Sequence, residues 1–218
     1  MRGRESTQVP TRREARPTAT LALEQALRAE GFFAIAGVDE AGRGPLAGPV
    51  VAAAVVLDPA AEVEGLADSK TLTAARRGTL YELILARAAA VGIASVPAAV
   101  IDRINIRQAT LLAMRRAVAA LSLPPDLALV DGNDPPALLC PVRTVVRGDS
   151  QVACIAAASI VAKVARDRIM DQVDSAHPGY DFAIHMGYGT ARHRAALAKL
   201  GPCTHHRRSF GPLKVDET

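Results

Sequence analysis

Two apolar segments separated by a stretch rich in glycine and proline constrain the fold of this chain more than any other feature. Residues 32–39 and residues 50–57 each have the length and apolar character of a strand. The residues between them include Gly42, Gly44, Pro45, Gly48 and Pro49, which favour turns over regular structure. We therefore expect these segments to pair as a hairpin.

The first of these strands ends in two adjacent carboxylates, Asp39 and Glu40. Neighbouring side chains of a strand point to opposite faces, and burying an unpaired carboxylate is costly. A hard divalent cation such as Mg²⁺ compensates this cost, since it prefers oxygen ligands from carboxylates and substrate phosphates. The Gly42-Arg43-Gly44 loop that follows would let a phosphate backbone approach closely. The segment indicates phosphodiester chemistry, although the two acids alone would also fit a solvated strand end.

The remainder of the chain alternates between helical and strand patterns. We expect helices at residues 73–90, 105–121, 152–173 and 190–200, and further strands at residues 92–96, 127–130 and 142–146. Asn105 and Thr190 suit N-caps, and Gly201 suits a C-cap. Strands that come first and then alternate with helices predict an α/β fold with a mixed central sheet flanked by helices.

Acids also follow two later strands. Asp131 ends the strand at residues 127–130, and Asp149 lies just beyond the strand at residues 142–146. Ligand sites of α/β sheets gather at the carboxyl ends of strands, so these acids could converge with Asp39 and Glu40. Two metal ions about 3.5–4 Å apart would then assist an in-line phosphoryl displacement. Two structural alternatives remain: Asp131-Gly132 is also a common turn dipeptide, and Asp149 or Ser150 could cap the next helix.

Composition limits the class of protein. The formal net charge of +4 and the pI of about 9.2 fit a nucleic-acid partner without demonstrating one. Cys140, Cys154 and Cys203 form neither a disulfide framework nor a zinc spacing, and a zinc site at Cys203 and His205 would lack two ligands. This use of cysteine fits a reducing cytoplasm. The apolar runs are too short to span a bilayer, so we expect no membrane association, and nothing in the sequence demands more than a monomer.

Three regions are expected along the chain. Residues 1–20 are rich in Arg, Thr and Pro and predict a disordered basic tail, residues 21–184 a catalytic domain, and residues 185–218 a basic helical segment. Between residues 185 and 214 the chain has no acid, and its basic side chains include Arg192, Arg194, Lys199, Arg207 and Arg208. These cations would neutralise duplex phosphates beside a groove; an ordinary solvated helix face is the alternative.

From residue 34 to residue 212 the chain resembles bacterial ribonuclease HII. The runs that carry the resemblance keep the order and approximate spacing of that family; they are residues 37–45 (Gly-Val-Asp-Glu-Ala-Gly-Arg-Gly-Pro), 68–70 (Asp-Ser-Lys), 105–106, 130–133, 148–149, 156–164, 187–190 (Gly-Tyr-Gly-Thr) and 206–210 (His-Arg-Arg-Ser-Phe). The resemblance implies a ribonuclease H-like fold with a small C-terminal helical segment. It also implies endonucleolytic hydrolysis of the RNA strand of RNA–DNA hybrids, and incision 5′ to single ribonucleotides in duplex DNA, leaving 5′-phosphate and 3′-hydroxyl ends.

The resemblance also assigns residues. It implies that the catalytic and metal-binding acids, which use Mg²⁺ or Mn²⁺, are Asp39, Glu40, Asp131 and Asp149. It implies that the substrate-binding residues are Gly42, Arg43 and Gly44 at the ribonucleotide 2′-hydroxyl, and Tyr188 stacking at the RNA–DNA junction. Backbone groups of such a loop suit this task, because the 2′-hydroxyl distinguishes RNA from DNA.

One residue departs from the family pattern, and alternatives remain for others. Met186 stands where the family often has Lys, which puts a phosphate contact and hence substrate affinity in doubt. Tyr188 taken by itself would suit a partly buried core position. Two other functions also remain open: a catalytically silent module that binds RNA–DNA hybrids, and a different nuclease-superfamily activity such as DNA strand transfer or exonuclease trimming.

Overall fold

A five-stranded mixed sheet forms the centre of the molecule, with strand order β3-β2-β1-β4-β5. The computed structural model describes residues 19–61 and 63–213. The strands are β1 (Ile35–Ala41), β2 (Val50–Leu57), β3 (Ala88–Val96), β4 (Leu127–Asp131) and β5 (Val142–Val145). β2 pairs antiparallel with both β1 and β3, whereas β1, β4 and β5 run parallel. The expected hairpin and mixed sheet are both confirmed.

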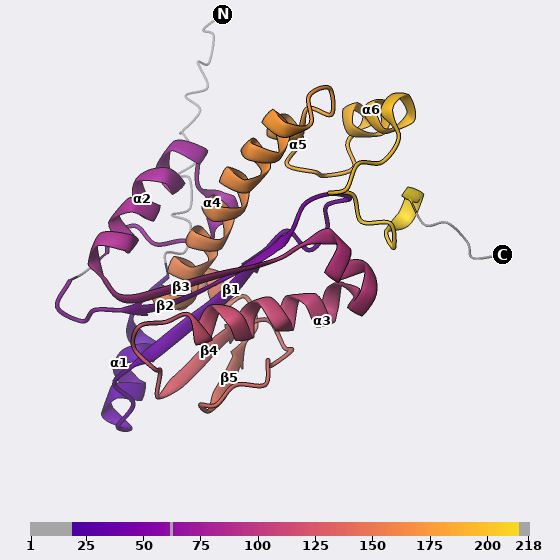
Figure 1. The fold of residues 1–218 in the computed structure, drawn as a ribbon. Helices are drawn as coiled ribbons and strands as arrows, with labels where there is room; N and C mark the ends of the chain where they lie inside the picture. Colours follow the sequence, from indigo (N-terminus) through magenta and orange to yellow (C-terminus); the bar gives the residue numbers. More distant parts are fainter. Residues whose placement is uncertain (1–18, 62, 214–218) are drawn as a thin grey trace, which may run out of the picture.

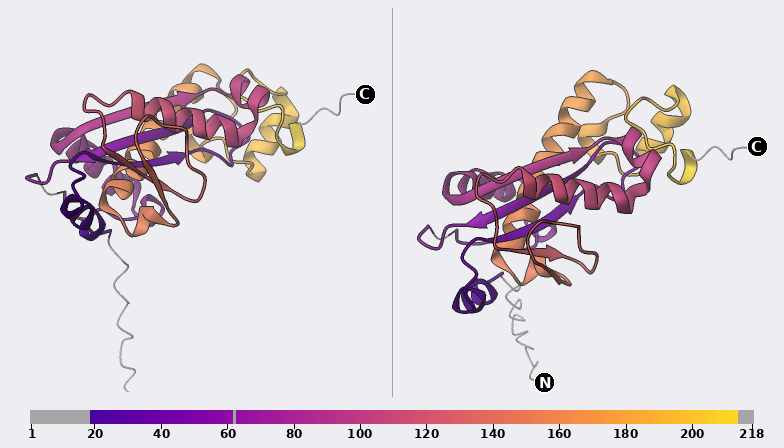
Figure 2. Two further views of the ribbon diagram at one scale, coloured as in Figure 1. Left: turned by 90° about the horizontal axis from the view of Figure 1, so that it is seen from below. Right: turned by 60° about the horizontal axis from the view of Figure 1, so that its bottom comes forward.

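Helices cover both faces of the sheet (Figure 1). α2 (Ala74–Arg87) and α4 (Ala153–Ala176) lie on one face, and α3 (Ala98–Ala119) lies on the other. α1 (Ala22–Ala29) is found at one end of the sheet, and the C-terminal segment with α5 (Phe182–His185) and α6 (Ala191–Leu200) at the opposite end, as both views in Figure 2 show. Short 3₁₀ turns form at η1 (Ser69–Thr71), η2 (Gly148–Ser150) and η3 (Gly211–Leu213).

The first half of α4 packs very closely against β1. Its residues are almost all small or apolar and are buried from Ala153 to Ala162. A Cβ added at Gly37 of β1 would lie 2.1 Å from the carbonyl carbon of Cys154, so only glycine permits this approach. The sequence predicted that this half of the helix lies against the sheet, and the structure confirms it.

Several predicted boundaries were wrong. The strand predicted from residue 32 begins only at Ile35, because the N–H groups of Phe33 and Ala34 both donate to the Asp126 carboxylate instead of to a neighbouring strand. The helix predicted to reach residue 90 ends at Arg87. The strand predicted from residue 92 begins already at Ala88, because the alanines that follow α2 pair with β2 and the sheet overrides their helix propensity.

Helix α3 has a kink that the sequence analysis placed correctly but interpreted as a helix start. Asn105 has φ 65° and ψ 165°, and its Oδ1 accepts the N–H of Gln108 at 3.1 Å, which is an N-cap contact. A helical segment from Ala98 precedes the kink, and this segment was missed.

The N-terminus of α4 is capped by a distant residue. Val152 stands at the N-cap position and makes no side-chain cap contact, and Ser150 Oγ donates to the carbonyl of Arg147. Instead Glu24 of α1, which is 1% exposed, accepts the N–H of Cys154 at 2.8 Å. The capping alternative for Asp149 and Ser150 was therefore wrong, and α1 was not predicted at all.

Part of the predicted basic tail is described by the structure. Thr20 bridges to Val152 in parallel orientation, whereas residues 1–18 lie outside the described part of the chain. Within residues 19–61 and 63–213 no helix is long and apolar enough to span a bilayer.

Candidate active site

Three carboxylates meet at the carboxyl ends of the parallel strands. Val38 of β1 pairs with Val130 of β4, so Asp39 and Asp131 follow at the same level on adjacent strands. Asp149 joins them from η2, directly after β5. Carboxylate oxygens of Asp39, Asp131 and Asp149 lie within 4.8 Å of one another. The convergence expected from the sequence is present for these three acids, hereafter the acidic triad.

Hydrogen bonds fix the orientation of each triad member. The N–H of Glu40 donates to Asp39 Oδ1, and the N–H of Gly148 donates to Asp131 Oδ1, both at 2.7 Å. Lys70 Nζ donates to Asp149 Oδ2 at 3.1 Å. Gly132 has φ +90°, a backbone conformation typical of a turn. The turn alternative for Asp131-Gly132 is therefore compatible with Asp131 as a member of the triad.

The triad concentrates negative charge in a poorly solvated place. Burial raises the pKa of Asp39 well above its usual range, and the charges of Glu40 and Asp131 raise it further. Burial also raises the pKa of Asp131, to which the charge of Asp149 adds. A divalent cation would relieve this repulsion, and an all-carboxylate donor set suits a hard ion such as Mg²⁺ or Mn²⁺. The residues present therefore fit a metal site.

Glu40 is not among the three acids whose carboxylate oxygens lie within 4.8 Å of one another. Val38 packs against α3, and Glu40, two residues later, lines a small cavity of about 40 Å³ together with Thr110 and Met114 of α3 and Asp131 of the triad. Its Oε1 accepts a hydrogen bond from Arg43 Nη1 at 3.3 Å. Burial raises the pKa of Glu40, whereas Arg43 lowers it. The structure thus places Glu40 beside the triad but on the α3 side, and its role as a metal ligand stays a prediction.

The loop at residues 42–44 lies over two buried arginines. Gly42 has φ +94°, and a Cβ there would lie 2.0 Å from Arg166 Nε. Arg207 donates to the carbonyls of Gly42 and Arg43. Glycine is therefore required at position 42 for its backbone conformation and for the close approach of Arg166. The sequence analysis missed Arg166, which lies two residues beyond the motif run at residues 156–164 and carries no local signal of its role.

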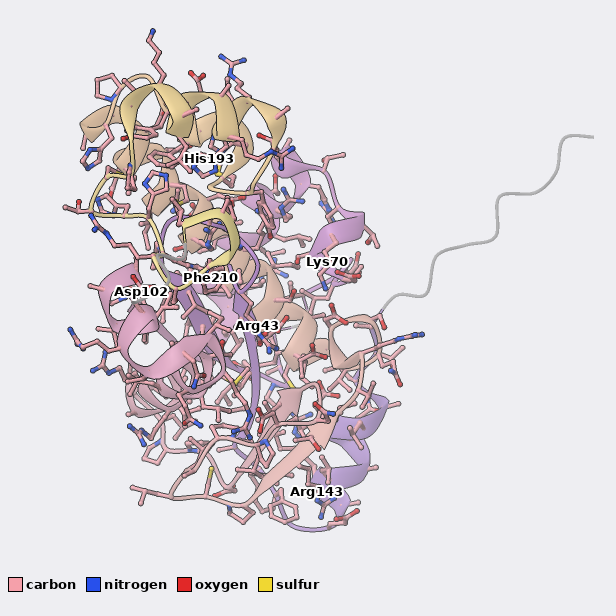
Figure 3. All side chains as sticks on the ribbon, turned by 90° about the vertical axis from the view of Figure 1, so that its right-hand side faces the viewer. Arg43, Lys70, Asp102, Arg143, His193 and Phe210 are labelled. Carbon is pink, nitrogen blue, oxygen red and sulfur yellow. The ribbon has the colours of Figure 1, made fainter. Side chains whose placement is uncertain are left out.

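Tyr188 borders this loop. Its side chain is 46% exposed, and a Cβ added at Gly44 would lie 3.9 Å from Tyr188 Cε1. The alternative of a core tyrosine was therefore wrong. In Figure 3, Arg43 lies between Phe210 and Arg143. Phe210 and, further from Arg43, His193 belong to the C-terminal segment, whereas Arg143 lies at the opposite end of the molecule.

The basic C-terminal segment differs from the expected row of solvated cations. Arg207 is 0% exposed, so it cannot neutralise duplex phosphates, and that expectation was wrong. Arg192 pairs with Asp181 at 2.6 Å, and Arg194 donates to the carbonyl of Gly189. Lys199 and Arg208 are exposed.

The zinc alternative gains no support from the structure. Cys203 Sγ lies 3.2 Å from His206 Nδ1. Within the part of the chain that the structure describes, the acidic triad is the only cluster of three or more His, Cys, Asp or Glu residues that could hold an ion.

The fold and the triad together define a class of protein. A mixed sheet flanked by helices, with carboxylates gathered at the ends of its parallel strands, is the arrangement of a metal-dependent nuclease with a ribonuclease H-like fold.

Comparisons with known proteins identify the family. The family model described as ribonuclease HII matches residues 36–212. Ribonuclease HII of Xanthobacter autotrophicus is 60% identical over 194 residues, which cover 89% of this chain and 78% of that protein. Ribonuclease HII of Geotalea uraniireducens is 52% identical over 201 residues, covering 92% and 93%. The chain belongs to the ribonuclease HII family.

Solved structures agree on the fold. Ribonuclease H2 from Pyrococcus horikoshii OT3 superposes with a TM-score of 0.71 at 24% identity, over 83% of this chain and 95% of that one. Ribonuclease HII in its complex with PCNA from Archaeoglobus fulgidus gives a TM-score of 0.69 at 25% identity, over 82% and 96%. The expected ribonuclease H-like fold is confirmed.

Membership fixes the activity. The chain is a metal-dependent endoribonuclease that hydrolyses the RNA strand of RNA–DNA hybrids and incises 5′ to single ribonucleotides embedded in duplex DNA. This two-metal-ion hydrolysis leaves 5′-phosphate and 3′-hydroxyl ends. The family assignment favours this activity over the silent binding module and the other nuclease reactions considered from the sequence.

Proposed function

We propose that the catalytic metal site consists of Asp39, Glu40, Asp131 and Asp149, and that it holds Mg²⁺ or Mn²⁺. The observation that supports this most directly is the convergence of three of these carboxylates within 4.8 Å. When bound, the ions supply an activated water and balance the charge that develops on the leaving 3′ oxygen. The protein contributes the fixed orientation of the acids, through the N–H groups of Glu40 and Gly148 and through Lys70.

Substrate selection is assigned to the loop and the tyrosine. We propose that the backbone of Gly42, Arg43 and Gly44 binds the ribose 2′-hydroxyl, and that the exposed ring of Tyr188 stacks at the RNA–DNA junction. A Cβ added at Gly44 would lie 3.9 Å from Tyr188 Cε1, and this closeness supports a joint surface, since one nucleotide could contact both residues. Stacking on an aromatic side chain contributes about 1–3 kcal/mol per base.

The surroundings of this site support three further assignments. We propose that residues 185–218 form a duplex-binding segment attached to a catalytic body at residues 21–184, with Lys199 and Arg208 as phosphate contacts. Met186 packs with the small apolar core of the C-terminal segment. It adds no cation there, so we expect weaker phosphate binding than in relatives with Lys.

We also propose a cellular compartment and an oligomeric state for the protein. We assign it to the cytoplasm, where ribonucleotides are excised from DNA, as a monomer. All three cysteines are free, which fits a reducing compartment.

The decisive experiment uses a DNA duplex with one internal ribonucleotide, incubated with Mg²⁺ or Mn²⁺. We expect incision on the 5′ side of the ribonucleotide, and none with EDTA or in an all-DNA duplex. Binding without incision under either metal would favour a silent binding module. Equal cutting of the all-DNA duplex would point to a different nuclease activity.

The assignment of acids is tested by isosteric variants. Asp39→Asn and Asp131→Asn should each abolish incision while the fold and much of the duplex binding remain, because the amide keeps the shape but loses the charge. Asp171→Asn, an exposed position of α4, is the matched control and should retain activity. Full activity in either triad variant would refute the proposed metal site.

A further inference from the structure

Arg207 is a fully buried cation whose hydrogen-bond partners are main-chain carbonyls. Its Nε donates to the carbonyl of Gly48 at 3.0 Å, its Nη1 to that of Arg43 at 2.9 Å, and its Nη2 to that of Gly42 at 2.5 Å. All three carbonyls belong to the connection between β1 and β2. Burying a charge is costly unless polar groups compensate it, so this loop and this arginine stabilise each other.

The direction of these hydrogen bonds determines where the loop amides point. A trans peptide is planar, so the N–H of one residue points opposite to the carbonyl of the residue before it, and the described residues contain no cis peptide. Arg207 holds the carbonyls of Gly42 and Arg43 toward the interior. The N–H groups of Arg43 and Gly44 therefore point away from Arg207, and neither donates to an acceptor among the described residues.

A second buried arginine connects this loop to Tyr188. Arg166 donates to the carbonyls of Ala47 and Pro49 and, through Nη1, to that of Met186 at 3.0 Å. The N–H of Leu46 in turn donates to the carbonyl of Gly187. The loop and the turn before Tyr188 are therefore held in one fixed relation.

We propose that Arg207 is a positioning residue for ribonucleotide recognition: by fixing the carbonyls of Gly42 and Arg43 inward, it presents the N–H groups of Arg43 and Gly44 to the ribose 2′-hydroxyl. The inference rests on the proposed role of the Gly42-Arg43-Gly44 loop and adds the residue that orients it. The planar guanidinium is suited to this task because it donates in fixed directions to several carbonyls at once, whereas the lysine ammonium is a compact point charge on a flexible stem. Its charge also polarises both peptide groups and strengthens their N–H donors.

The test compares two affinities in one protein. Arg207→Lys is introduced into the Asp131→Asn background, which prevents cleavage, and dissociation constants are measured by fluorescence anisotropy with Mg²⁺. One duplex carries a single ribonucleotide and the other is all DNA. We expect the preference for the ribonucleotide duplex to fall about tenfold, the effect of losing two hydrogen bonds of ordinary net strength. A merely structural loss of active protein would reduce binding to both duplexes alike and leave their ratio unchanged.

Arg116→Lys in the same background is the matched control. Arg116 is an exposed arginine in the last turn of α3 and has no role in the proposed site, so this change should keep the ratio of the two affinities. A folded Arg207→Lys protein with an unchanged ratio overturns the inference while the proposed function stands. If the parent protein itself binds both duplexes equally, the proposed role of the loop fails and this inference fails with it.

A measurement on the full chain without any change at Arg207 covers the case in which Arg207→Lys does not fold. In the Asp131→Asn protein, the backbone amide NMR signals of Arg43 and Gly44 should shift and gain protection from exchange on binding the ribonucleotide duplex. They should respond much less to the all-DNA duplex. Equal responses, or none, would overturn the inference.

Discussion

The C-terminal segment contains a chain of buried histidines that predicts how the protein responds to acid. The N–H of Cys203 donates to His206 Nδ1 at 3.0 Å, so His206 carries its proton on Nε2 and donates it to His193 Nε2, also 3.0 Å away. His193 Nδ1 then donates to the carbonyl of Tyr188 at 3.0 Å. In this arrangement both rings are neutral, and protonating His206 on Nδ1 would break the first contact.

The size of the effect follows from the shifted pKa of His206. Burial, and secondarily the neighbouring His193, lower this pKa from 6.5 to about 4. Between pH 6.5 and pH 4 the imidazole of His206 is therefore protonated in the unfolded chain but neutral in the folded protein. Its contribution to the free energy of unfolding is fully present above pH 6.5 and is lost as the pH falls. From pH 6.5 to pH 5, at 1.36 kcal/mol per pH unit, His206 alone removes about 2 kcal/mol of unfolding free energy.

Urea unfolding of the wild type and of His206→Gln, followed by circular dichroism at pH 7 and pH 5, measures this contribution. The variant should be less stable at pH 7 because it loses the hydrogen-bond chain. At pH 5 the difference in unfolding free energy between the wild type and the variant should be about 2 kcal/mol smaller than at pH 7, because only the wild type has the imidazole of His206. Parallel pH dependences for wild type and His206→Gln, or an NMR titration of His206 near pH 6.5, would refute the reasoning.

Three further predictions concern the site and the core. Burial and neighbouring acids raise the pKa of Asp39, so removing its charge should relieve repulsion within the triad. In EDTA, Asp39→Asn should therefore raise the melting temperature by about 2–4 °C for each kcal/mol of repulsion relieved. A lower melting temperature would contradict charge repulsion among the three acids. Millimolar Mg²⁺ should raise the melting temperature of the wild type, and removing the metal with EDTA should reverse the rise; scanning calorimetry that shows no shift would argue against a metal site. Gly37→Ala should lower the unfolding free energy by more than about 3 kcal/mol, because its Cβ would overlap Cys154 of α4. Gly78→Ala on the open surface of α2 should instead raise it by up to about 1 kcal/mol, and equal effects in urea unfolding would count against the close packing.

The sequence by itself determined the type of most elements and the location of the site. Apolar runs that end in acids are local patterns, and the rule that parallel strands present their carboxyl ends together was enough to bring Asp39 and Asp131 to one edge. The alternation of side chains along a strand likewise anticipated that Asp39 and Glu40 would face different sides. For Asp149 the local pattern left a capping role open, and only the structure showed that a residue 130 positions away from Cys154 caps α4.

The tertiary structure decided the roles that depend on distant partners. An arginine in a basic run is ordinarily solvated, and nothing within a few residues of Arg207 marks it as buried. Its partner Gly48 is 159 positions away in sequence, so the compensation for its charge exists only once the C-terminal segment packs on the β1–β2 loop. The same holds for the alanines that begin β3, which are helical by propensity and extended because β2 offers hydrogen bonds. Short-range patterns specify which element a segment can form. Whether a buried charge or polar group finds hydrogen-bond partners depends on which segments pack together in the tertiary structure.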